Sequence, residues 1–187
     1  MSDMLLKSLQ SIGHFSEVEL ETIIGKFETM SHKAGEVLLE VGEICDRFWF
    51  LEQGSIRKYH KNDNVDEVNH GLFTAGSWFL DHTSFTGRKP ARYRIEAYGA
   101  SKTSSISVHH LHDLMGTSQV YFQLGKILEK GQHMAFDPNS KPEQRYLEVL
   151  ENRPALLTAF PLKHIASYLG MTPETLSRVR KRISSLS

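Results

Sequence analysis

IASYLGMTPETLSRVRKR, residues 165–182, has the pattern of two short helices joined by a tight turn at Gly170. Glycine accepts the positive φ that such a turn needs, and the small Ala166 lets the two helices cross closely. Thr172 is a good N-cap, and Pro173 suits the first helical turn, where its missing N–H costs nothing. A second helix is therefore predicted to begin at a defined residue. The apolar positions expected to face inward are Ile165, Ala166, Leu169, Leu176, Val179 and Ile183.

The outward face of this second helix is polar and basic. An arginine and an acid near the start of a helix suit the major groove, where arginine pairs with guanine O6 and N7 and glutamate accepts from cytosine N4. From Pro161 onward the chain carries five bases and one acid, a net charge of +4, while the residues before it carry −4. The alternative is an ordinary helical hairpin with a charged surface. The expected outward positions are Glu174, Ser177, Arg178 and Lys181.

The middle of the chain, from about Lys33 to Val108, has short runs rich in Val, Ile, Phe, Trp and Tyr. Glycines at 35, 42, 54, 76, 87 and 99 interrupt these runs, which predicts an antiparallel barrel or jelly roll. Residues 92–97 alternate between charged and apolar side chains. This alternation predicts that Tyr93, Ile95 and Ala97 point inward and that the charged residues point outward.

Helices are expected on both sides of this β region. Ser16 and Glu19 form a capping box at the start of an N-terminal helix. Residues 118–136 read as a longer helix with two apolar stripes, which suit either a core-facing helix or a helix that also packs on a partner helix. Residues 137–142 then read as a linker, and Gln144–Glu151 as a further helix.

PEQRYLEVLENRPALLTAFPLKHIASYLGMTPETLSRVRKRI (142–183) resembles the C-terminal part of Crp/Fnr-type bacterial transcription regulators. HKAGEVLLEVGEICDRFWFLEQGSIRKYH (32–60) resembles the first half of their cyclic nucleotide-binding β-roll. The resemblance implies an α+β chain with a β-roll sensor domain at 1–117 and its flanking helices, a long connecting and dimerising helix at 118–137, and a small all-α helix-turn-helix domain at 138–187. It also implies a homodimer that binds a double-stranded DNA operator, with an unknown small-molecule effector. The expected DNA-binding residues are Thr172, Glu174, Thr175, Ser177, Arg178, Lys181 and Arg182.

The chain departs from the family in the segment that binds the cyclic phosphate. Leu80-Asp81 stands where family members that bind cyclic AMP have Gly-Glu, and Ala91 stands where they have the phosphate-binding arginine. Arg92 is one place away, and a shift of one residue moves a side chain to the other face of a strand. We therefore expect no binding of cyclic AMP unless a bulge at Lys89-Pro90 re-aims Arg92 or Arg88 reaches in. The candidate pocket residues are Trp78, Asp81, Arg88, Arg92 and Tyr93, with ordinary core positions as the alternative for the aromatic ones.

A second departure concerns the C-terminal end. Many family members continue into a β-hairpin wing that contacts the DNA backbone, whereas only Ser184–Ser187 follow Ile183 here. Fewer phosphate contacts predict weaker and less salt-dependent binding per subunit, with dimerisation compensating.

Other kinds of chemistry find little support in the sequence. The single cysteine, Cys45, suits a buried small hydrophobe, and the HHxH group at His109, His110 and His112 lacks a zinc spacing, although it leaves haem ligation open. The sequence contains no GxSxG, HExxH or phosphate-loop motif, so we expect no enzyme, metal or cofactor. The absence of an 18-residue apolar run or a signal peptide favours a cytoplasmic protein that does not contact a membrane.

Overall fold

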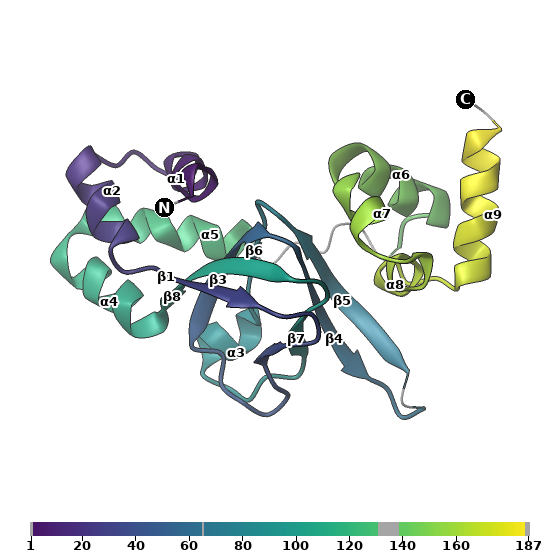
Figure 1. The fold of residues 1–187 in the computed structure, drawn as a ribbon, viewed down its shortest axis with the longest axis horizontal. Coiled ribbons are helices and arrows are strands. Elements are labelled where there is room, and N and C mark those ends of the chain that lie inside the picture. The colour runs from purple at the N-terminus through teal and green to yellow at the C-terminus, as the bar shows by residue number, and fades with distance from the viewer. Residues whose placement is uncertain (1, 65, 131–138, 186–187) are drawn as a thin grey trace.

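The computed structural model describes residues 2–64, 66–130 and 139–185. Two four-stranded antiparallel sheets form a β-roll, with helices at one side and a separate group of helices at the other (Figure 1). The fold is therefore the mixed α+β arrangement that the turn glycines and the helical tail predicted.

The first sheet has the strand order β1-β8-β3-β6 and the second the order β2-β7-β4-β5. Gly54 makes the tight turn between β3 and β4 with φ +90°, and a Cβ there would lie 2.4 Å from the carbonyl oxygen of Ala100. A larger residue would therefore clash at this turn as well as strain it. The strands are β1 (Glu28–His32), β2 (Val37–Leu39), β3 (Arg47–Gln53), β4 (Ser55–Lys61), β5 (Glu67–Thr74), β6 (Trp78–Phe79), β7 (Arg94–Ala97) and β8 (Ser101–Ser107).

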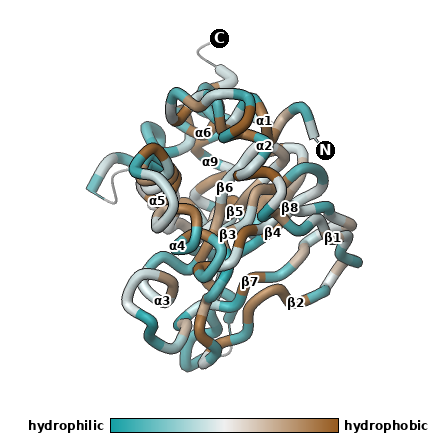
Figure 2. The backbone as a smooth tube through the Cα atoms, turned by 90° about the vertical axis from the view of Figure 1, so that its left-hand side faces the viewer, coloured by the Kyte–Doolittle hydropathy of each residue, from teal (hydrophilic) through white to brown (hydrophobic). Residues whose placement is uncertain are grey.

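The core of the roll is large and aromatic, and it extends under the neighbouring helices. Phe48, Phe50 and Phe79 are fully buried at its centre. Figure 2 shows hydrophobic stretches in the central strands and hydrophilic stretches in many of the loops around them. The helices on this side are α1 (Asp3–Gln10), α2 (Glu17–Ile24), α4 (Val108–Thr117), the 3-10 helix η1 (Gln119–Leu124) and α5 (Gly125–Lys130).

The helix starts follow local chemistry. The predicted capping box of Ser16 and Glu19 is present at the start of α2. The helix predicted over 118–136 begins instead as a 3-10 segment, η1, before α5, and its remaining positions from 131 lie outside the described residues. Tyr121, Leu124 and Ile127 from both predicted stripes are buried in the core of the roll. Within the described part, this segment is thus a core-facing element.

The C-terminal unit consists of four helices and has its own small core. Leu72 of β5 belongs to the same core, so the unit packs directly on the edge of the second sheet. In Figure 1, α8 lies beside β5 and α9 stands on the far side, away from the roll. The helices are α6 (Pro142–Asn152), α7 (Ala155–Ala159), α8 (Leu162–Tyr168) and α9 (Pro173–Ser184).

Candidate DNA-binding face and effector domain

The pair α8 and α9 forms a helix-turn-helix with the predicted turn. Gly170 has φ +65°, and the amide of Met171 donates to the carbonyl oxygen of Ala166 at 3.0 Å, which closes the end of α8. Thr172 caps α9 by accepting from the amide of Thr175 at 3.2 Å. The apolar side chains Ala166, Leu176 and Val179 are buried between the helices. The backbone therefore fixes the direction of α9 from its first residue.

The polar face of α9 lies open to solvent. Glu174, Ser177, Arg178 and Lys181 are all exposed, and they lie opposite the buried Leu176 and Val179. Thr172 is also exposed, and Thr175 is half-buried. The structure therefore brings the predicted DNA-binding residues together on one helix that the protein itself does not cover.

Two of these residues have local partners that matter for binding. Hydrogen bonds from its own backbone amide and from the Thr172 hydroxyl lower the pKa of the Glu174 carboxyl, which keeps it a charged acceptor. Arg182 is paired with Glu143 of α6, so its guanidinium is less available for phosphate than its exposure alone implies. Arg178 Nε lies 3.4 Å from the carbonyl oxygen of Glu174, a long hydrogen bond, and the charge of Arg178 also acts on the Glu174 carboxyl.

The sequence reasoning missed how the helical unit is held on the roll. Arg153 donates from Nη2 to the carbonyl oxygen of Leu72 at 2.6 Å and from Nη1 to the hydroxyl of Tyr168 at 2.9 Å. The amide of Asn69 donates to the hydroxyl of Ser167 at 2.9 Å. Side chains of the helices therefore satisfy main-chain groups on the open edge of β5, which would otherwise be left for pairing with another chain.

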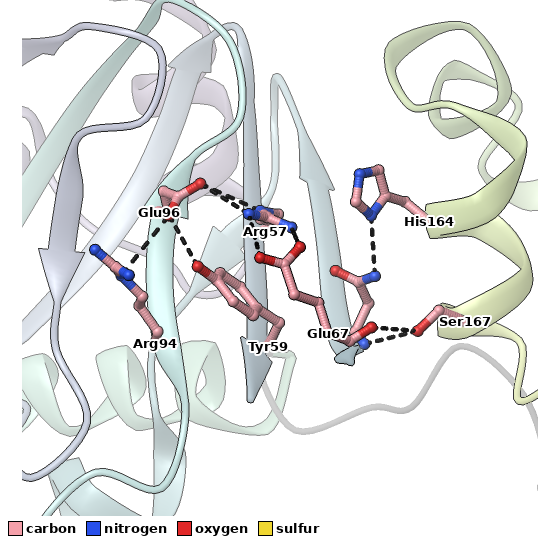
Figure 3. A network of polar contacts seen from close by, with 8 residues as sticks. Arg57, Tyr59, Glu67, Arg94, Glu96, His164 and Ser167 are labelled. Atoms are coloured by element: carbon pink, nitrogen blue, oxygen red, sulfur yellow. Dashed lines mark hydrogen bonds and ion pairs between the residues drawn. The ribbon is translucent and has the colours of Figure 1, made fainter. Parts of the chain in front are cut away.

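A buried polar network lies beneath this interface, on the face of the second sheet that points toward the helices (Figure 3). Arg57 is at its centre, paired with Glu67 and with Glu96, and its guanidinium lies 4.0 Å from the centre of the Tyr59 ring. The hydrogen bond from Arg57 lowers the pKa of the Glu67 carboxyl. The side-chain nitrogen Nδ2 of Asn69 lies 3.2 Å from Nδ1 of the buried His164, and this contact links the sheet to α8.

The interior of the roll lacks an arginine at the expected phosphate position. Ala91 is buried there, and its backbone pairs with Glu43 and Gly42. The next residue, Arg92, is exposed and lies with Arg94 on the outer side of the sheet. Tyr93 points the other way, with its ring 4.4 Å from the ring of His70. The alternation predicted for residues 92–97 is thus present around β7.

Two of the five candidate pocket residues make contacts elsewhere in the roll. Trp78 is a core residue, stacked on Phe48 at 4.9 Å and donating from its indole to Ser8 at 2.8 Å. Arg88 is exposed, has φ 50°, and donates to the carbonyl oxygen of Cys45 at 3.2 Å. These contacts give Trp78 a role in the core and tie Arg88 to the backbone before β3.

Asp81 has a structural role as a helix cap, which the sequence analysis did not predict. It caps a helix, α3 (His82–Gly87), by accepting from the amide of Ser84 at 3.2 Å, and it is buried. Its second carboxylate oxygen has no hydrogen-bond partner among the described residues. The Asp-x-x-Ser spacing is the signal that could have predicted this short helix.

Lys58, which the sequence analysis did not single out, is a largely buried cation whose charge interacts with that of Asp81. Its ammonium lies 3.4 Å from the carbonyl oxygen of Leu80 and 5.5 Å from the centre of the Tyr93 ring. Burial lowers its pKa, and the charge of Asp81 opposes that effect. Only the alternation of β4, with Ile56, Lys58 and His60 on one face, could have indicated that this lysine points inward.

Histidines form a pair rather than a metal cluster in this part of the fold. His60 Nδ1 and His70 Nε2 are 2.8 Å apart. Across residues 2–64, 66–130 and 139–185, no three His, Cys, Asp or Glu side chains are placed to hold a metal ion. Cys45 is buried, and burial raises the pKa of its thiol to about 11. None of the helices in the described ranges is both long and apolar enough to cross a membrane.

Comparison with known proteins finds one matching family model and several solved structures of similar fold. The cyclic nucleotide-binding domain family matches residues 29–118. No curated protein matches the sequence. Among solved structures, FixK2 from Bradyrhizobium japonicum is similar, with a TM-score of 0.67, 16% identity and coverage of 86% of this chain and 85% of that one.

Two further solved structures extend the likeness over most of the chain. The regulator CLP of Xanthomonas campestris, described as responsive to c-di-GMP, has a TM-score of 0.58 and 17% identity, with 91% of this chain and 92% of that one covered. The catabolite activator protein of Thermus thermophilus has a TM-score of 0.53 and 13% identity, with 91% and 84% covered. Residues 29–118 thus match the cyclic nucleotide-binding domain family, and the solved structures that resemble most of this chain in fold are Crp/Fnr-type transcription regulators.

Proposed function

We propose that this chain is a sequence-specific DNA-binding transcription regulator of the Crp/Fnr type. The observation that carries the proposal is the exposed face of α9, where Glu174, Ser177, Arg178 and Lys181 lie in line while the opposite face is buried. Glu174 and Arg178 would contact base edges. Thr172, Thr175, Lys181 and Arg182 would contact mainly phosphates, which position the helix on the duplex.

The protein would act as a homodimer. Each chain offers one reading helix, and two such helices in successive major grooves lie about 34 Å apart on a roughly palindromic operator. The segment from residue 118 onward would bring the two copies together, as the connecting helix does in the family that the sequence resembles. A dimer also doubles the number of phosphate contacts that one short helix can make.

The effector of the roll would not be cyclic AMP or cyclic GMP. Ala91 occupies the position of the phosphate-binding arginine, and Arg92 lies on the outer side of the sheet. Loss of such an arginine costs about 2 to 5 kcal/mol, or roughly 30-fold to several thousand-fold in affinity. Asp81 uses one carboxylate oxygen to cap α3, and its charge would repel a cyclic phosphate that lacks an arginine partner.

Titration with cyclic AMP tests the effector proposal. A ligand that binds only the folded state raises the melting temperature in proportion to its occupancy. We expect no shift at micromolar cyclic AMP. A clear shift that is lost in Lys58→Met would overturn the proposal and would identify Lys58 as the replacement for the missing arginine.

Selection of bound sequences from a pool of random duplexes tests the DNA proposal without knowledge of the effector. We expect a two-fold related consensus whose half-sites are one helical turn apart. The competing function is a ligand-binding regulatory module whose helical tail does not bind DNA specifically. Recovery of no consensus, from protein shown to be folded by its cooperative melting, would favour that function and contradict ours.

A further inference from the structure

A hollow of about 410 Å³ lies on the outer side of the roll, where β4 and the start of β7 meet the loop after β2. Arg92 and Arg94 face it, whereas the alternating Tyr93 and Ile95 point inward, and its lining also includes His60, whose ring centre lies 6.0 Å from that of Tyr93. Its volume falls within the range of about 300 to 1,000 Å³ that is usual for small-molecule sites. We call it the basic hollow, and it is lined by Glu40, Val41, Tyr59, His60, Lys61, Arg92 and Arg94.

The charged side chains that line the basic hollow are mainly positive. Lys61, Arg92 and Arg94 bring three cations to it, and Glu40 brings the single acid. The side chains of Lys61 and Arg92 are exposed, and neither makes a hydrogen bond or a close ion pair within the described part of the chain, although the charge of Lys61 also acts on Glu67 across the strand pair. Two cations without a close ion-pair partner therefore line one concave surface.

The third cation, Arg94, lies near two carboxylates, but neither is close enough for a strong charged hydrogen bond. Its Nε lies 3.4 Å from a carboxylate oxygen of Glu40 and 3.7 Å from one of Glu96, and it makes no hydrogen bond within the ranges described. Both distances are longer than a good charged hydrogen bond, which is about 2.7 to 2.9 Å. An arginine positioned by two distant acids is ready to bind a closer anion.

We propose that the basic hollow binds a small organic or inorganic anion with at least two negative charges, of the phosphate or dicarboxylate class. Two guanidinium groups suit such an anion because each presents two parallel N–H donors to a pair of oxygens. A single negative charge would leave the hollow net positive, whereas a dianion matches the excess of two cations that remains after Glu40 is counted. The site does not depend on DNA binding by α9.

A chain of polar contacts connects the basic hollow to the interface between the second sheet and α8. Arg94 also contacts Glu96, which pairs with Arg57 in the network beneath the helical unit (Figure 3). The carbonyl oxygen of Glu67, the other partner of Arg57, accepts from the hydroxyl of Ser167 at 3.3 Å. An anion that draws Arg94 away from Glu96 would therefore act at one end of a chain of contacts whose other end is α8.

Calorimetric titration of the full chain tests the site with three probes: inorganic phosphate, pyrophosphate and succinate. The test variant is Arg92→Gln, which removes an exposed cation and leaves the fold intact. The matched control is Lys33→Gln, which removes an exposed cation from the turn after β1, outside the hollow. Comparison of the three probes distinguishes a preference for phosphate from a preference for carboxylates.

We expect saturable binding of at least one probe, weakened about tenfold or more in Arg92→Gln, because one charged hydrogen bond contributes about 1.5 to 3 kcal/mol. Lys33→Gln should bind like the wild type. Absence of saturable binding by all three probes would overturn the proposal, as would equal affinity in Arg92→Gln. A third contrary result is loss of duplex DNA affinity in Arg92→Gln without small-anion binding, which would assign the hollow to the DNA backbone instead.

Discussion

Replacement of Arg57 by methionine should strongly destabilise the protein. Arg57 is 8% exposed, and it pairs with Glu96, whose side chain is 12% exposed, and with Glu67, whose side chain is 34% exposed. Methionine keeps most of the length of the side chain but removes the charge, so Glu67 loses its ion-pair partner and Glu96 is left with the Tyr59 hydroxyl at 3.0 Å and the more distant Arg94. Removal of one member of a buried ion pair costs about 3 to 5 kcal/mol. We expect the lower end of this range, because Glu67 retains access to water.

Urea unfolding at neutral pH measures this loss. The matched control is Arg47→Met, which breaks the ion pair with Glu28, where the side chains are 30% and 51% exposed. An exposed pair contributes at most about 1 kcal/mol. The double variant Arg57→Met/Glu67→Gln should be more stable than the sum of the two single changes predicts, because it removes one of the stranded charges. If Arg57→Met loses no more free energy of unfolding than Arg47→Met, the network does not stabilise the sheet as we describe.

Three further predictions concern the helical unit. Burial lowers the pKa of His164, so its stabilising contribution is complete above the unfolded pKa of about 6.5 and decreases as the pH falls below it. In His164→Gln the free energy of unfolding should depend less on pH below 6.5. An unchanged slope of the free energy of unfolding against pH would contradict this role of His164. Gly170→Ala should lower the free energy of unfolding by about 1 to 2 kcal/mol, since alanine resists φ +65° and its Cβ would lie 3.1 Å from Nη1 of Arg145; a thermal melt equal to wild type would argue against this backbone. Lys181→Ala should reduce the slope of log affinity against log salt by about one, and Arg182→Ala by less because Glu143 already pairs with Arg182; equal slopes would refute that distinction.

The local features of the fold could be predicted because each depends on a few neighbouring residues. The capping box at Ser16, the cap at Thr172 and the turn at Gly170 all appear where the sequence placed them. The inward direction of Tyr93 followed from strand alternation, which also sends Arg92 to the outer side. These signals are short in range, so one sequence contains them completely.

Features that depend on long-range packing could not be predicted in the same way. Asn69 and Ser167 are distant in the chain, and nothing near either residue indicates that the amide of one meets the hydroxyl of the other. The alternation of β4 indicates the face on which Lys58 lies, but not that its ammonium meets the carbonyl oxygen of Leu80, which is distant in the chain. The 3-10 start of η1 replaces the predicted regular helix where Tyr121 and Leu124 pack into the roll. Tertiary contacts decided each of these cases.

The most direct test of the central claim is the affinity of wild type and Arg178→Ala for a selected duplex and for versions of it changed at single base pairs. If the exposed face of α9 reads bases, Arg178→Ala loses about 1 to 3 kcal/mol on the selected duplex and no longer distinguishes guanine at one position of each half-site. Equal affinity and unchanged base preference in the two proteins would contradict the assignment of α9 as the DNA-reading helix.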